Sequence, residues 1–111
     1  MGRKPQKNDS LPGSLDMLIL KALENRRLHG YAIVQFIEQS SANEILVEEG
    51  SLYPALYRME ERGWLGSEWA VTDTGRRARF YKLTRAGRTQ LAAESKSWDR
   101  LTTAVHSVMK A

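Results

Sequence analysis

The 111-residue sequence contains no cysteine, only three prolines and only two histidines. The lack of cysteine excludes disulfide bonds and thiolate metal sites, and it suits a protein of the cytoplasm. No apolar run is long enough to cross a bilayer and no signal-peptide pattern opens the chain, so we expect a cytoplasmic protein with no membrane partner. A hydrophobic share of 41% and a charged share of 27% predict one soluble globular domain with a modest core.

Groups suited to catalysis are also scarce. Neither His29 nor His106 is paired with a nucleophile or placed at metal-ligand spacing. Asp73-Thr74-Gly75 has the character of a turn, and no glycine-rich phosphate loop precedes a helix. We therefore expect no enzymatic activity, no cofactor and no metal site.

Positive charge is gathered in two segments. The formal net charge is only +4, with a sequence pI of about 9.6. Residues 1–13 are predicted to form a flexible basic arm, which carries Arg3, Lys4 and Lys7. From residue 76 to residue 88 every charged side chain is basic: Arg76, Arg77, Arg79, Lys82, Arg85 and Arg88. Such a cluster favours an anionic partner such as nucleic acid, although an ordinary solvated turn would also carry it.

Apolar periodicity predicts three helices in the first half of the chain. A stripe with helical spacing runs from Leu15 to Leu23, and a second helix follows Gly30 and ends in the polar residues 40–43. A third helix occupies the stretch up to Glu61, with Gly63 as its C-terminal cap. The short apolar segment 45–47 between the second and third helices is either a small strand or an extended link.

The second half predicts a hairpin and a long helix. Residues 64–71 and 78–84 are rich in aromatic and branched side chains and flank a polar turn with a basic tip. Thr84 is placed to cap a final helix. Apolar residues in that helix follow a short heptad seam, which Glu94 interrupts, and which consists of Leu91, Trp98, Leu101, Val105 and Val108.

The start of the third helix has an unusual composition. If Ser51 is the N-cap, Pro54 lies in the first turn, where a missing N–H is tolerated, and the free N–H groups point outward to suit a phosphate. Tyr53 and Tyr57 share one face, while the leucines of this helix point to the core. This helix front is therefore either an outward-facing recognition surface or only a helix start with half-buried packing tyrosines.

Four strings in this order resemble the PadR family of bacterial transcriptional regulators. They are residues 29–33 (HGYAI), 49–56 (EGSLYPAL), 59–65 (MEERGWL) and 79–87 (RFYKLTRAG). The resemblance runs from about Gly13 to the C-terminus and is to the short subgroup with a single C-terminal helix. It agrees with the element order, three helices, a hairpin and a long helix, which is that of a winged helix-turn-helix. We expect a mainly α fold with a small β-hairpin (α+β).

The resemblance implies a homodimer that binds palindromic double-stranded operator DNA, usually as a repressor, and that is released by a small aromatic or hydrophobic effector in many relatives. It places the recognition helix at Ser51, Tyr53, Pro54, Tyr57 and Arg58, and the wing contacts at Arg76, Arg77 and Arg79. Trp98 matches a tryptophan that lines the dimer interface and stacks on flat ligands in some relatives, although simple packing in the seam would also explain it.

The expected organisation is a basic arm at residues 1–13, a winged-helix DNA-binding domain at 14–84 and a dimerisation helix at 85–111. Two other functions are open on the sequence alone. One is a winged helix that binds another protein, and the other is a small-molecule-binding protein with weak DNA binding. Steep salt dependence of duplex binding separates DNA binding from the first.

Overall fold

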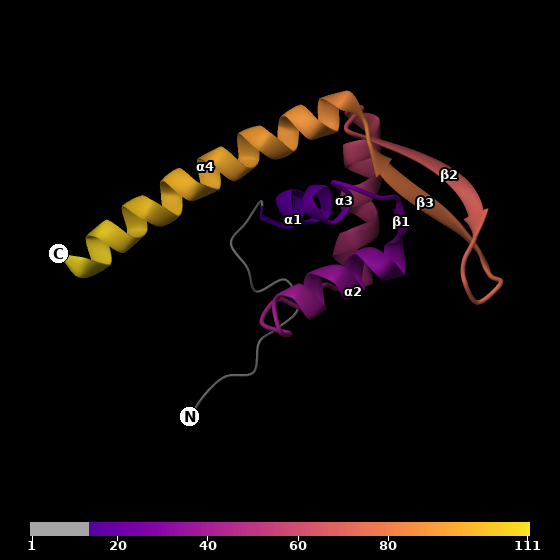
Figure 1. The fold of residues 1–111 in the computed structure, drawn as a ribbon, viewed down its shortest axis with the longest axis horizontal. Helices are drawn as coiled ribbons and strands as arrows, with labels where there is room; N and C mark the ends of the chain where they lie inside the picture. Colours follow the sequence, from indigo (N-terminus) through magenta and orange to yellow (C-terminus); the bar gives the residue numbers. More distant parts are fainter. Residues whose placement is uncertain (1–13) are drawn as a thin grey trace.

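The computed structural model describes residues 14–111, so the predicted basic arm lies outside the described residues (Figure 1). The helices are α1 (Ser14–Ala22), α2 (Gly30–Ser40), α3 (Glu49–Glu61) and α4 (Arg85–Lys110). The strands are β1 (Leu28–His29), β2 (Leu65–Val71) and β3 (Arg77–Leu83). The expected α+β winged helix is confirmed, with one strand more than the sequence predicts.

The core lies where the apolar faces of α1, α2 and α3 meet. The predicted stripes of these three helices are buried or partly buried, and the largest side chains with almost no exposure are Ile19, Leu20, Leu23, Ile33, Leu52, Leu56 and Met59. Val47, in the link between α2 and α3, joins this core. Its backbone N–H donates to Glu38 on α2 at 3.1 Å, which fixes the link against the helix.

The wing belongs to a three-stranded antiparallel sheet with the order β1-β3-β2. β2 and β3 pair along their whole length, from Leu65 opposite Leu83 to Val71 opposite Arg77. The sequence did not reveal β1, because two residues are too few to show the alternation by which strands are recognised. β1 fixes the start of α2 to the sheet, since His29 pairs with Phe80 and its Nδ1 also accepts a hydrogen bond from the Ala32 N–H.

The start of α3 differs from the prediction. The N-cap is Glu48, with extended backbone angles, and Ser51 is the third residue of the helix. Pro54 therefore lies inside the helix, where it removes the N–H that would bond to the Gly50 carbonyl. The burial of Leu52, Ala55, Leu56 and Met59 offsets that loss and holds the segment helical through the proline.

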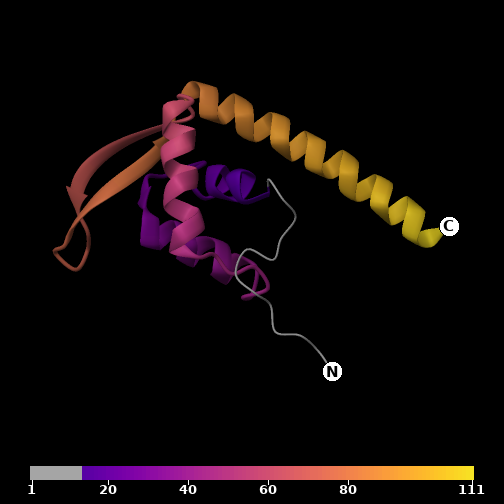
Figure 2. The same ribbon diagram turned by 180° about the vertical axis from the view of Figure 1, so that it is seen from behind.

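The C-terminal helix begins where the sequence predicts. Thr84 is its N-cap, and the Thr84 hydroxyl accepts from the Gly87 N–H at 3.0 Å and donates to the Gly63 carbonyl at 2.6 Å. From this anchor α4 runs out beyond the three-helix body, on the opposite side from the wing loop (Figure 2). Within residues 14–111 no helix has the length and apolar character needed to span a bilayer.

Gly87 marks the closest approach between α4 and the rest of the chain. A Cβ atom at Gly87 would lie 2.1 Å from the Trp64 carbonyl oxygen, whereas a Cβ atom at Gly50 would meet nothing within 4 Å. We predict that Gly87→Ala lowers the free energy of unfolding by about 3 kcal/mol, because a backbone atom must move. Gly50→Ala, the matched control, should be neutral or stabilising by up to ~1 kcal/mol. Urea unfolding measures both, and equal stability of the two variants would contradict the close-packing account.

Candidate nucleic-acid interface

The outward face of α3 is aromatic. Tyr53 and Tyr57 are 48% and 68% exposed, while Leu52 and Leu56 on the opposite face are fully buried. Tyr53 also packs against the start of α2, since its hydroxyl would lie 2.7 Å from a Cβ atom at Gly30. The tyrosine face is thus held by α2 as well as by the core, and a Cβ atom at position 30 would displace the Tyr53 hydroxyl.

The N-terminal end of α3 does not suit a phosphate. Glu48 and Glu49 stand exposed at this end, and their carboxylates interact favourably with the helix dipole but repel an anion. The Ser51 and Leu52 N–H groups donate to the Glu48 carbonyl at 3.0 Å and are not free. The predicted N-cap at Ser51 is wrong, because the helix begins three residues earlier, and the two carboxylates at the actual start argue against a phosphate there. Its side face, not its tip, is the candidate reading surface.

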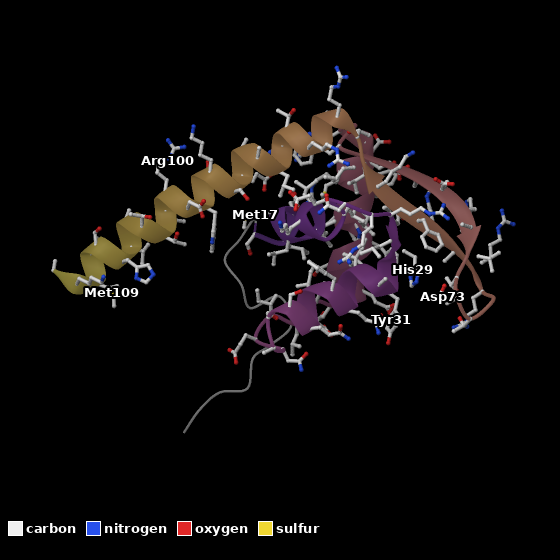
Figure 3. All side chains as sticks on the ribbon, in the orientation of Figure 1. Met17, His29, Tyr31, Asp73, Arg100 and Met109 are labelled. Atoms are coloured by element: carbon white, nitrogen blue, oxygen red, sulfur yellow. The ribbon has the colours of Figure 1, made fainter. Side chains whose placement is uncertain are left out.

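The tip of the wing is a tight turn that presents arginine. The Thr72 N–H donates to the Arg76 carbonyl at 2.7 Å, and the Arg76 N–H donates to the Thr72 hydroxyl at 3.1 Å. Gly75 has a φ of +83°, which favours glycine at this position. Asp73 marks the loop in Figure 3. Arg76 and Arg77 are both exposed here, as the sequence predicts for wing contacts.

Arg79 is held against α3 rather than presented at the tip. Its guanidinium lies 3.1 Å from the Glu60 carboxylate, and its Nε donates to the Ser67 hydroxyl at 2.9 Å. The same hydroxyl donates to Glu60 at 2.6 Å, so the three side chains form one network. Glu60 and Arg79 border a concavity of about 460 Å³ between α3 and β3, lined by Tyr53, Tyr57, Glu60, Glu61, Arg79 and Tyr81.

Tyr81 forms the inner side of that concavity and is 7% exposed. Burial raises the pKa of Tyr81 above its ordinary 10.0; Glu60 and Tyr53 add to the shift, and Arg79 opposes it. The Tyr81 hydroxyl consequently keeps its proton throughout the neutral range. Of the residues that line the concavity, only Arg79 is basic; Glu60 pairs with it, and Glu61 adds a second carboxylate.

Arg58 is also engaged within the chain. It lies in the last turn of α3, and its guanidinium contacts the Asp16 carboxylate of α1 at 2.6 Å. The resemblance placed Arg58 among the recognition residues, and it is indeed on the recognition helix. Its charge, however, is paired with an acid 42 residues away in sequence, which sequence spacing does not reveal.

The seam residues of α4 fall into two groups. Leu91 is 6% exposed and belongs to the core of its own chain, so the structure corrects its assignment to a surface seam. Trp98 is half-buried, and the seam beyond it is open to solvent, where Leu101, Val105 and Val108 are exposed. Only this outer part of the predicted seam is available to a partner chain.

Two exposed aromatic residues lie near the interface that sequence reasoning did not single out. Tyr31, at the start of α2, lies parallel to His29 with 6.5 Å between ring centroids (Figure 3). Trp69, on β2, is 57% exposed beside the wing arginines. The strand period, together with the hairpin register, could have identified Trp69, because it places this residue on the same face as Arg77 and Arg79. Among the residues described, no cluster of three acidic or histidine side chains forms that could hold a metal ion.

The three-helix core, the sheet with its basic tip and the aromatic outer face of α3 define a winged-helix protein. The profile described as "Transcriptional regulator PadR-like family" matches residues 19–93. The chain thus belongs to the PadR-like family of transcriptional regulators, as the sequence motifs indicate.

Known proteins agree with this assignment. The chain is 36% identical over 83 residues to "Transcriptional regulator Rv3488" of Mycobacterium tuberculosis, covering 75% of this chain and 74% of that protein. A PadR family transcriptional regulator from Eggerthella lenta has 30% identity and a TM-score of 0.74, covering 87% of this chain and 82% of the other. A PadR family transcription regulator from Clostridium difficile has 28% identity and a TM-score of 0.75, covering 87% and 99%.

Proposed function

We propose that the protein is a sequence-specific DNA-binding repressor that acts as a homodimer on a palindromic operator and responds to a small ligand. The observation that carries the DNA-binding part is the common orientation of α3 and the wing. Tyr53 and Tyr57 of α3 line the same concavity as Arg79 of β3. Because side chains alternate along a strand, Arg77 shares the Arg79 face and looks to the same side of the molecule.

This arrangement assigns different tasks to the two elements. With α3 in the major groove, Tyr53 and Tyr57 would contact base edges and sugars, and Ser51 and Pro54 would border them. Arg76 and Arg77 at the wing would bind phosphates or enter the adjoining minor groove, which gives affinity more than sequence choice. Arg58 and Arg79, which are paired with carboxylates, contribute less free charge. Direct base reading is therefore sparse, and DNA shape adds to the specificity.

The homodimer rests on the exposed side of α4. Trp98, Leu101, Val105 and Val108 follow heptad spacing on a helix of 26 residues, which is about 39 Å long. Burying this stripe against the same stripe of a second chain would remove exposed apolar surface and bring two wings to one duplex. A twofold axis through the pair would match a palindrome, with the recognition helices roughly 34 Å apart.

Removing the wing charges tests the DNA contact. We predict that Arg76→Ala combined with Arg77→Ala weakens binding to every duplex and reduces the salt slope by about 2, because two phosphate-neutralising charges are lost. Lys96→Ala combined with Arg100→Ala is the matched control, since it removes two charges from the side of α4 away from the seam and should leave the salt slope unchanged. Filter binding or fluorescence anisotropy across a salt series measures both slopes. An unchanged slope in the variant that lacks Arg76 and Arg77 would contradict the assignment of these residues as phosphate contacts.

Removing one tyrosine tests the reading helix. We predict that Tyr53→Ala weakens binding to the operator more than binding to random duplex, because Tyr53 would contact bases or sugars only in the fitted complex. Urea unfolding controls for the loss of its packing on Gly30. An equal loss of affinity for the operator and for random duplex in a folded variant would contradict the assignment of α3 as the recognition helix.

A charge placed in the α4 seam tests the dimer. We predict that Val105→Asp gives monomers and lowers operator affinity to nearly that of random DNA, because an unpaired carboxylate would be buried between the helices. Thr103→Asp, on the opposite side of α4, adds the same charge outside the seam and should leave the dimer intact. Sedimentation equilibrium reads the mass of each, and a Val105→Asp dimer would place the interface elsewhere.

Ligand response rests on the family resemblance and on Trp98. This residue is half-buried at the inner end of the open seam, where a flat molecule would enter between two chains. We predict that a flat aromatic compound quenches tryptophan fluorescence and releases operator DNA, and that both effects are absent in Trp98→Leu. Undiminished quenching in that variant would assign the response to another site.

A further inference from the structure

Trp69 is the largest apolar side chain exposed on the wing. It is 57% exposed on β2, directly opposite Arg79 and two residues before Val71, which is itself 66% exposed opposite Arg77. The core needs neither side chain, because the buried part of this sheet face ends at Leu65, Tyr81 and Leu83. The indole of Trp69 therefore lies on the same face of the hairpin as the buried residues, but in the part of that face that is exposed to solvent.

The guanidinium of Arg77 lies over the Trp69 indole, with 5.2 Å from its central carbon to the ring centroid. This contact is a cation–π interaction, which favours a flat, stacked guanidinium. Within residues 14–111, the arginine ion pairs engage Arg27, Arg58 and Arg79 but not Arg77. Stacking leaves the edge of the guanidinium, with its N–H donors, available to an acceptor.

Both faces of the hairpin carry basic side chains, and Lys82 lies on the face away from Trp69. The face that carries Trp69 also carries Arg77 and Arg79, and its neighbouring acid, Glu60 of α3, is already paired with Arg79. Glu68, the acid of β2, lies on the other face and pairs with Arg27 at 3.1 Å. The Arg77 guanidinium beside Trp69 is therefore available to an anionic partner.

We propose that Trp69 is a positioning residue for DNA binding, which holds the Arg77 guanidinium edge-on for insertion into the minor groove beside the half-site. The proposal rests on the proposed DNA-binding function. An arginine inserted in a minor groove prefers the narrow groove of A·T-rich DNA, where the negative potential is strongest. The stacked indole restricts the rotamers of Arg77, so less conformational freedom is lost when the complex forms. In this division Arg76 binds phosphate, Arg77 reads groove shape and Arg79 braces α3 to the wing.

A double-mutant cycle on the operator tests the coupling. The variants are Trp69→Ala, Arg77→Ala and their combination, with Arg76→Ala and its combination with Trp69→Ala as the matched control. We expect each single variant to lose roughly five- to tenfold in affinity, and the combination of Trp69→Ala with Arg77→Ala to lose little more than either alone. Trp69→Phe, which keeps an aromatic ring, should retain much of the affinity. Trp69→Ala with Arg76→Ala should lose the product of the two single effects.

A second measurement separates groove reading from general loss of affinity. Exchanging the A·T pairs beside the half-site for G·C adds an amino group to the minor groove, and exchanging them for inosine·C does not. We expect the wild type to bind the G·C duplex more weakly than the A·T duplex and the inosine·C duplex as tightly as the A·T duplex. We expect Trp69→Ala and Arg77→Ala each to bind the three duplexes with equal affinity.

The outcomes distinguish this inference from the proposed function. If the wild type binds no inverted repeat better than random duplex, the proposed DNA-binding function fails, and this inference fails with it. If the wild type binds specifically but the losses of Trp69→Ala and Arg77→Ala multiply, or if Trp69→Ala keeps full affinity and groove sensitivity, this inference alone is overturned. Thermal unfolding controls for folding, and Trp69→Leu, which is apolar but has no ring to stack on Arg77, replaces Trp69→Ala if that variant unfolds early.

Discussion

The burial of one face of α3 is the constraint on which the rest of the structure depends. Leu52, Leu56 and Met59 have no exposed surface, and they keep the segment helical in spite of Pro54. With that face fixed in the core, Tyr53 and Tyr57 have only the outward direction left. The packing of Tyr53 on Gly30 then joins the reading surface to α2, so core packing and the candidate DNA contact are parts of one arrangement.

The arginines of this surface fall into two groups, those paired with a carboxylate of the same chain and those that are not. Asp16 engages Arg58, and Glu60 engages Arg79 together with Ser67. These partly exposed pairs each contribute little stability, roughly 0–1 kcal/mol. Their effect is to neutralise the charges of Arg58 and Arg79. The arginines that remain unpaired within residues 14–111 at the wing are Arg76 and Arg77, which lie where a duplex held against α3 would meet the hairpin. Electrostatic attraction to a duplex is thereby concentrated at the wing, because Glu60 and Glu61 lie beside the tyrosines on the outward face of α3.

The sequence predicts the local structure well and the long-range pairing poorly. Helical stripes, the left-handed Gly63 that follows the Arg62 C-cap of α3, the Thr84 cap and the two hairpin strands follow from periods and turn chemistry that each span a few residues. The start of α3 was wrong, because Ser51 and Pro54 fit an N-terminal pattern although the helix begins at Glu49. β1 was too short to recognise. Arg58 pairs with Asp16, Arg79 pairs with Glu60, and Leu91 is buried in the core of its own chain. These contacts join segments that are distant in sequence, so the periodicity of a single segment does not predict them.

The central claim is that α3 and the wing together recognise a specific operator. Selection of bound fragments from genomic DNA, followed by dissociation constants for the selected fragment and for random duplex at several salt concentrations, tests it most directly. The account predicts an inverted repeat with half-sites about one helical turn apart, bound ~10³-fold or more tightly than random DNA. Equal, salt-sensitive binding to all duplexes would contradict it and leave only a basic winged helix without sequence recognition.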